Sequence, residues 1–291
     1  MAAKIIDGKS LAAEVRSSLK TAIASLAARG ARPGLAAILA GGDPASRIYV
    51  RNKARACEET GVRSELHEFA ENVSEGALLE RIAALNADRA VHGILIQLPL
   101  PRQLNADRVL AAVSPAKDVD GFHAANLGAL LQGRPGFVPG TPAGVMRLLE
   151  HARVAPAGKQ AVIVGRSTIV GKPLALLLLQ KDATVTICHS KSADLAALTR
   201  QADVLVSAAG RAKLITAPMV KPGACVIDVG INRMANGKLC GDVDFDAVKE
   251  IAGSITPVPG GVGPMTVAML IVNTVRAAEL NLGKTVEQSA S

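Results

Sequence analysis

Aromatic side chains are nearly absent from this chain of 291 residues, which has no tryptophan, four phenylalanines and a single tyrosine, Tyr49. Hydrophobic residues make up 49% of the chain and charged residues 20%, so a large core has to be built from alanine, valine, leucine and isoleucine. Such side chains suit parallel strands that are covered by helices. The composition therefore predicts a globular α/β protein of one large or two medium domains.

Long apolar runs are also missing, and none approaches the length of a membrane span. The first residues lack the basic segment followed by an apolar stretch that marks a secretory signal. The four cysteines, Cys57, Cys188, Cys225 and Cys240, do not have the paired spacing of a metal motif. We therefore expect a cytoplasmic protein with buried thiols, no metal site and no membrane partner.

Acidic residues are outnumbered, with 25 Asp and Glu against 33 Lys and Arg, which leaves a formal charge of +8. This excess indicates anionic partners. The basic residues are scattered and are not interleaved with aromatics, so nucleic acid is not the expected partner. A phosphorylated cofactor and an acidic small molecule explain the positive net charge equally well.

Predicted strands and helices alternate along the chain, which implies mostly parallel sheets. The last predicted helix is too long to serve only the second half of the chain, and we expect it to return to the first. The residues from 284 onward are expected to be disordered. Helices are predicted at 10–29, 45–60, 75–87, 143–153 and 265–282, and strands at 35–40, 63–69, 91–97, 161–164, 183–188, 204–207 and 225–229.

The most informative segment is residues 161–173, where a short apolar run ends at Gly165 and a second glycine, Gly171, opens an apolar helix. A strand, a tight turn and a helix in this order can hold a phosphate or pyrophosphate on free backbone N–H groups. The spacing departs from the usual Gly-x-Gly-x-x-Gly pattern. An ordinary βα turn with solvated basic side chains therefore stays open as the alternative.

The following strand ends at Ser190 and Lys191, about where an NAD-binding fold carries an acid for the ribose hydroxyls. No acid is present there. A hydroxyl and a cation, together with Arg166 in the turn, suit a ribose that carries a 2′-phosphate. The sequence therefore predicts NADP as the cofactor.

Candidate chemical groups gather in the first half of the chain. Tyr49 and Lys53 lie four residues apart on one predicted helix, so they share a face, although a solvated basic helix face is the alternative. Gln97 ends a buried strand, where it either caps backbone or lines a ligand site. Asp118 and Asp120 follow in a tight loop, in which Asp118 can stabilise the turn while Asp120 binds a guanidine-like edge or a cation.

Five segments taken in order resemble the bifunctional methylenetetrahydrofolate dehydrogenase/methenyltetrahydrofolate cyclohydrolase family. The similarity runs nearly from end to end, from Ile6 to the helix after Gly263. The five segments are residues 49–53 (Tyr-Val-Arg-Asn-Lys), 96–101 (Ile-Gln-Leu-Pro-Leu-Pro), 117–123 (Lys-Asp-Val-Asp-Gly-Phe-His), 165–173 and 259–266.

The resemblance implies two α/β domains with a cleft between them. Residues 1–140 with 267–291 would form a folate-binding catalytic domain, and residues 141–266 a Rossmann-like NADP-binding domain. The implied reactions oxidise methylenetetrahydrofolate with NADP⁺ and hydrolyse the methenyl product to 10-formyltetrahydrofolate, in one-carbon metabolism and purine biosynthesis. A homodimer is also implied.

By the family pattern Lys53 is central to the hydrolysis and Gln97 holds it. Tyr49 would stack on the folate, and Asp120 would accept hydrogen bonds from its amino-pterin edge. The implied cofactor positions are Gly165, Arg166, Ser167, Ser190 and Ile231.

Two departures from the family pattern lie outside these positions. Gly140 stands where many relatives carry a cysteine, and Ala124 and Ala125 stand where a proline is usual. Two other functions share some of these features. A short-chain dehydrogenase also uses Tyr and Lys four apart, but there the glycine turn precedes the pair. A non-catalytic nucleotide- or RNA-binding protein would not require Lys53, Gln97 and Asp120 together.

Overall fold

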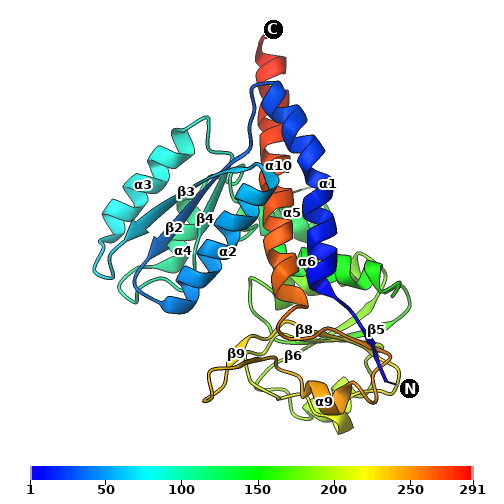
Figure 1. Cartoon of the computed structure of the whole chain (residues 1–291). Coiled ribbons are helices and arrows are strands. Elements are labelled where there is room, and N and C mark those ends of the chain that lie inside the picture. The colour runs from blue at the N-terminus through cyan, green and yellow to red at the C-terminus, as the bar shows by residue number, and fades with distance from the viewer. Residues whose placement is uncertain (1, 135, 290–291) are drawn as a thin grey trace. The chain divides into compact units, whose positions relative to one another are not determined.

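The computed structural model describes residues 2–134 and 136–289, with the side chains of 284–289 excepted (Figure 1). The chain divides into two compact units, which we name by their main sheets. The six-stranded unit comprises Met1–Ala13 and Pro139–Thr266, and the three-stranded unit comprises Glu14–Val138 and Val267–Ser291. Two of the three divisions fall inside α1 (Gly8–Ala28) and α10 (Val262–Ser289), and the third lies between Val138 and Pro139.

The six-stranded unit is built on one sheet in which every strand pair is parallel, in the order β1-β11-β8-β7-β5-β6. From β5 the chain first adds β6 on one side and then β7 on the other, so the order reverses between β5 and β7. The strands are β1 (Lys4–Ile5), β5 (Gln160–Val164), β6 (Thr184–Cys188), β7 (Val204–Ser207), β8 (Cys225–Asp228) and β11 (Ser254–Ile255).

Helices connect these strands. They are α6 (Gly140–His151), α7 (Gly171–Leu179), α8 (Leu195–Thr199), the 3₁₀ turn η1 (Ala217–Met219) and α9 (Phe245–Val248). A short antiparallel ribbon follows β8 and consists of β9 (Asn232–Arg233) and β10 (Leu239–Cys240). Strands β7 and β8 are buried along their whole length. Their aliphatic side chains contribute to the core, as expected for a chain with so few aromatic residues.

The three-stranded unit has a parallel sheet in the order β3-β2-β4. Its strands are β2 (Gly34–Ala40), β3 (Arg63–Phe69) and β4 (Gly93–Ile96), and its helices are α2 (Pro44–Thr60), α3 (Glu75–Ala87), α4 (Ala106–Ala112) and α5 (Ala124–Leu131). Strand β2 lies in the middle and is buried throughout. In β3, at the edge, partly buried and exposed residues alternate, as expected of a strand with one covered face.

Helix α2 is defined at both ends by local chemistry. The carboxylate of Asp43 caps its first turn by accepting the backbone N–H of Ser46 at 2.8 Å, and Pro44 occupies the first helical position. At the other end Gly61 adopts a left-handed conformation with φ of 90°. These caps set the limits of the helix that carries Tyr49 and Lys53.

The predicted helices and strands are present, although α6 begins at Gly140, three residues before the predicted start, and three further details differ. Residues 1–13 group with the six-stranded unit and not with the first domain, because β1 pairs with β11. The last helix begins at Val262, three residues before the predicted start. The predicted disorder from residue 284 is wrong as far as Ser289, since α10 continues to that residue and no proline or turn sequence ends it earlier. Residues 290 and 291 lie outside the described residues.

All four cysteines are free, and three of them are buried. Within the part of the chain that the structure describes, no helix has both the length and the hydropathy needed to cross a membrane.

One buried amide links distant segments of the three-stranded unit. The Nδ2 group of Asn273, on α10, donates to the carbonyl oxygens of Val119 at 2.8 Å and of Val138 at 2.9 Å. Asn273→Ala would leave both carbonyls without this donor, and we expect it to lower the free energy of unfolding by about 1–3 kcal/mol.

Urea and thermal unfolding would measure this loss. The matched control is Asn72→Ala, at an exposed position whose side chain has no hydrogen-bond partner among the described residues. Equal stability of the two variants would show that the Asn273 amide does not hold these segments.

Candidate functional site

The side chains of Lys53 and Gln97 meet in the three-stranded unit. Gln97 directly follows β4, and Lys53 lies midway along α2. The Nζ group of Lys53 donates to Oε1 of Gln97 at 3.1 Å, and Nε2 of Gln97 donates to the carbonyl oxygen of Leu98 at 2.7 Å. The second hydrogen bond fixes the amide so that its oxygen faces the lysine. The sequence had left open whether Gln97 caps backbone or faces a site, and its amide does both.

Asp120 is the charged partner of this pair. Burial raises the pKa of Asp120 to about 6, Lys53 opposes this shift, and Asp118 adds to it. Burial also lowers the pKa of Lys53, against the attraction of Asp120. The two pKa values are thus displaced toward each other and toward neutrality. A lysine and a carboxyl group tuned in this way are suited to proton transfer near pH 7.

Tyr49 lies one helical turn before Lys53 and is partly buried. Burial raises the pKa of its hydroxyl, which therefore stays protonated at neutral pH. As the only tyrosine in the chain, it supplies an aromatic face next to the lysine, and a flat ring system can stack there.

The loop that carries Asp120 is held by Asp118, as the sequence suggested. The carboxylate of Asp118 is buried and accepts the backbone N–H groups of Phe122 at 3.1 Å and His123 at 2.8 Å. It also accepts Nδ2 of Asn126 at 2.8 Å. The tight turn therefore has a fixed shape around Asp120.

Sequence reasoning missed two residues that support this loop. Asn126 joins Asp118 to the carbonyl of Pro115 at 3.0 Å, and Asn273 binds the carbonyl of Val119, the residue between the two aspartates. Buried asparagines are uncommon in cores and satisfy backbone groups when they occur. An isolated Asn in an apolar helix pattern was the only signal available in the sequence.

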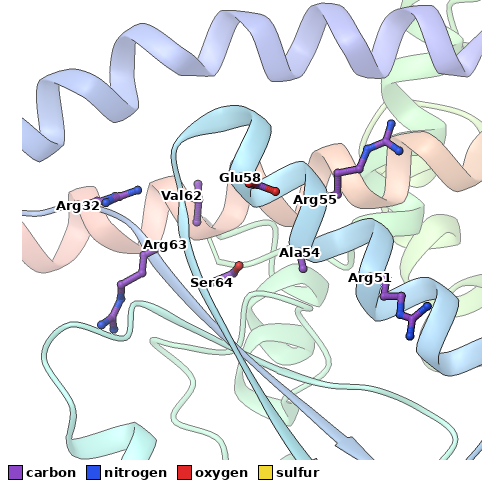
Figure 2. A pocket seen from close by; sticks show the side chains of 8 residues that line it. All are labelled: Arg32, Arg51, Ala54, Arg55, Glu58, Val62, Arg63 and Ser64. Carbon is purple, nitrogen blue, oxygen red and sulfur yellow. The ribbon is translucent and has the colours of Figure 1, made fainter.

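A separate basic groove lies in the same unit (Figure 2). Two of its arginines are fixed by backbone carbonyls, since Arg32 donates to Gly61 at 3.1 Å and Arg63 to Ala90 at 3.1 Å. None of the predicted site residues lines this groove, because its α2 residues lie on a different helix face from Tyr49 and Lys53. The lining residues are Arg32, Arg51, Ala54, Arg55, Glu58, Val62, Arg63 and Ser64.

The glycine turn of the six-stranded unit lies where the strand order reverses. Gly165 follows β5 with φ of +139°, and a Cβ atom at this position would collide with the backbone of Ala208, which follows β7. A Cβ on Gly171 would collide with the carbonyl of Gly165. Glycine is thus required on both sides of the turn. In open parallel sheets this is the position where ligands bind.

The turn fits a phosphorylated dinucleotide. Within the part of the chain that the structure describes, the backbone N–H groups of residues 166–169 have no hydrogen-bond acceptor, so they are free for an anion. The Ser167 hydroxyl accepts the N–H groups of Val170 at 3.1 Å and Gly171 at 3.4 Å. These bonds fix the remainder of the turn and define the start of α7.

The remaining predicted cofactor residues follow the ends of neighbouring strands. Val164 pairs with Cys188, so Arg166 and Ser190 each come two residues after a paired position. Arg166, Ser190 and Lys191 are all exposed. Ile231 follows β8 and is 44% exposed, which is unusual for isoleucine and leaves an apolar contact available. Among the described residues, no group of three or more His, Cys, Asp or Glu side chains forms a potential metal site.

Comparisons with known proteins find matches for both the part of the chain that carries Lys53 and the part that carries the glycine turn. Residues 6–120 match the catalytic domain of the tetrahydrofolate dehydrogenase/cyclohydrolase family, and residues 139–282 match its NAD(P)-binding domain. The bifunctional protein FolD of Verminephrobacter eiseniae is 62% identical over 279 residues, which are 96% of this chain and 98% of that protein. The FolD protein of Paracidovorax citrulli is 59% identical over 283 residues, 97% and 100% of the two chains.

Solved structures give the same result. The bifunctional FolD enzyme of Campylobacter jejuni superposes with a TM-score of 0.94 at 49% identity, over 96% of this chain and 99% of that chain. The Trypanosoma brucei dehydrogenase-cyclohydrolase, which was solved with an NADP cofactor and an inhibitor, gives 0.92 at 40% identity, over 96% and 98% of the two chains. The predicted α/β fold with a Rossmann-like domain is confirmed, and the chain belongs to the tetrahydrofolate dehydrogenase/cyclohydrolase family.

Proposed function

We propose that this chain oxidises methylenetetrahydrofolate to methenyltetrahydrofolate with NADP⁺ and hydrolyses that product to 10-formyltetrahydrofolate. The observation that carries the proposal is the hydrogen bond of Lys53 to Gln97 at 3.1 Å beside the charge of Asp120. This constellation occurs in a member of the family that also has a glycine turn suited to a dinucleotide. The three-stranded unit takes the folate in this proposal, and the six-stranded unit takes the cofactor.

In the first reaction, NADP⁺ held at the glycine turn between Gly165 and Gly171 would supply the acceptor for a hydride from the methylene bridge of the folate. The lone pair of the neighbouring folate nitrogen stabilises the cation that remains, so the protein's contribution is positioning more than proton transfer. Tyr49 stacks on the folate, and the carboxylate of Asp120 accepts hydrogen bonds from the amino-pterin edge.

In the second reaction, water adds to the methenyl carbon and loses a proton. The hydroxyl group formed in this way then loses its own proton to solvent and becomes the formyl carbonyl, while the bond from the carbon to one folate nitrogen breaks and that nitrogen takes up a proton, so that one proton is released overall. Lys53 is suited to accept the first proton and return the second, because burial lowers its pKa. Gln97 keeps Nζ in position by accepting one of its N–H groups.

On the cofactor side, the free N–H groups of residues 166–169 would hold phosphate oxygens. Arg166 and Ser190 would bind the 2′-phosphate of the ribose, with Lys191 adding positive charge nearby. Gly165 allows the close approach of backbone to cofactor, Ser167 fixes the turn, and Ile231 offers an apolar contact. The exposed side chains of Arg166 and Lys191, and the lack of an acidic residue directly after β6, support NADP over NAD.

The proposal extends to the setting of the enzyme. The resemblance supports a homodimer in the cytoplasm that acts in one-carbon metabolism and supplies purine biosynthesis with its formyl donor. Tetrahydrofolate derivatives would be its partners besides the cofactor and the second copy of the chain, and neither nucleic acid nor a membrane would be among them.

The proposal is tested by following methenyl and 10-formyl products separately in the presence of NADP⁺ or NAD⁺. Lys53→Met should lower the hydrolysis rate at least about 100-fold, since a general acid–base group contributes roughly 10²–10⁴-fold, while folding and NADP⁺ binding survive. Lys20→Met, an exposed lysine of α1, is the matched control. Normal hydrolysis by a folded Lys53→Met enzyme would remove Lys53 from the mechanism.

The hydrolysis should lose rate on the acid side with a midpoint near the pKa of Asp120, about 6. Below this pH the carboxylate gains a proton, loses acceptor capacity toward the amino-pterin edge and withdraws its charge from Lys53. In Asp120→Asn the rate should be lower but flat between about pH 5 and 7. The measurement is kcat/KM against pH, corrected for the uncatalysed rate. An unchanged acid limb in the variant would assign the titration to another group.

Arg166→Ala should weaken the binding of NADP⁺ by roughly 10-fold or more, as expected for a lost charge-assisted hydrogen bond, and that of NAD⁺ by less than about twofold. Arg200→Ala, an exposed arginine after α8, should change neither. Titration calorimetry with both cofactors measures the difference. Equal losses for the two cofactors would exclude a 2′-phosphate role for Arg166.

A further inference from the structure

A buried carboxylate joins the loops at the ends of β7 and β8. Asp242 is fully buried, and its oxygens accept the consecutive backbone N–H groups of Ala209 at 2.7 Å, Gly210 at 3.0 Å and Arg211 at 2.9 Å. Three successive N–H groups that converge on one carboxylate form an anion-binding nest. The loop after β7 is therefore wrapped around Asp242.

The same carboxylate also reaches the loop after β8. Its Oδ1 atom accepts Nδ2 of Asn232 at 2.9 Å, and its Oδ2 atom is 3.4 Å from the hydroxyl of Ser207. Asn232 directly follows Ile231, a proposed cofactor residue. Asp242 thus joins the loop that follows β7 to the loop that follows β8.

A second buried carboxylate, Asp228, holds Asp242 in place. Asp228 ends β8 and accepts the backbone N–H groups of Asp242 at 3.0 Å and Val243 at 2.8 Å, and also that of Gly230 at 3.0 Å. A Cβ atom on Gly230 would collide with the Asp242 carboxylate, and one on Gly241 with the Asp228 carboxylate. The segment is packed so closely that both positions must be glycine.

Neither carboxylate is in a salt bridge within the described residues. Their charge is met by N–H groups and by the Asn232 amide. Burial and the neighbouring Asp242 raise the pKa of Asp228 to about 7, while its own N–H donors oppose the shift. Keeping two acids so close without a cation is costly.

The loops held in this way border the glycine turn. The backbone N–H of Ala208 donates to the carbonyl of Val164 at 2.8 Å, and Ala208 is the residue against which Gly165 packs. Residues 209–211 continue directly from this contact. On the other side, Ile231 lies between Gly230 and Asn232. The backbone N–H of Gly230 donates to Asp228, and the side-chain amide of Asn232 donates to Asp242.

We propose that Asp242 is a positioning residue for the dinucleotide, which holds residues 208–211 and 230–232 in the arrangement that binds the cofactor. The inference rests on the proposed function, because it assigns these loops to the dinucleotide site. Asp242 touches neither reactant and acts through the backbone of the two loops. Its removal should therefore affect cofactor binding and leave hydrolysis at Lys53 intact.

The test compares Asp242→Asn with the parent enzyme in three measurements. The dissociation constant of NADP⁺, determined by calorimetry, should rise at least tenfold. The hydrolysis rate without cofactor should stay within twofold. Hydrogen–deuterium exchange of the enzyme without cofactor should be faster at the amides of residues 209–211, since an asparagine amide cannot accept all the bonds of a carboxylate. Asp246→Asn, an exposed aspartate of α9, should match the parent in all three.

Asn232→Ala is a milder variant, which we expect to fold even where Asp242→Asn does not, because it removes a partly exposed amide and leaves both buried acids in place. It should raise the dissociation constant of NADP⁺ about threefold. Unchanged NADP⁺ binding in a folded Asp242→Asn or Asn232→Ala enzyme overturns the proposal, as does a parallel loss of NADP⁺ binding and hydrolysis. Failure of the parent enzyme to bind NADP⁺ would instead contradict the proposed function.

Discussion

Parallel strand pairing is the constraint on which the rest of this structure depends. Parallel strands end at the same edge of a sheet, so the residues that follow them are brought together even when they are far apart in the chain. Gln97 follows β4, while Gly165, Ser190, Ala208 and Ile231 follow β5, β6, β7 and β8. The candidate dinucleotide site is therefore a property of one sheet edge, and the long sequence between its members contains the crossover helices that parallel pairing requires.

Both sites place charge in poorly solvated surroundings, but they stabilise it differently. In the three-stranded unit, Lys53 and Asp120 are partial counterions, and the pKa values of both are displaced toward neutrality. In the six-stranded unit, Asp242 is surrounded by backbone N–H groups and has no salt-bridge partner among the described residues. The first arrangement leaves protons free to move. The second fixes the backbone, because releasing any one N–H group would leave a buried carboxylate less satisfied.

The sequence was sufficient to predict the features that depend on local patterns. The helix that presents Tyr49 and Lys53, the buried strand before Gln97 and the turn from Gly165 to Gly171 are each specified by neighbouring residues, through caps, apolar runs and glycines. The roles of these residues came from the family resemblance and stay proposals. Asp118 was also recognised as a turn residue, because the groups that donate hydrogen bonds to its carboxylate lie within eight positions of it along the chain.

The missed features are those in which a side chain acts across a long stretch of sequence. Asn273 binds a carbonyl 154 positions away, and Asp242 binds amides 31 to 33 positions away. The pairing of β1 with β11 joins residues near opposite ends of the chain. In the sequence, Asp242 looks like one more polar residue beside a glycine, where a turn is the ordinary explanation. Only the fold distinguishes an aspartate that terminates a turn from one around which two loops are organised, and that distinction separates a replaceable acid from one on which cofactor binding depends.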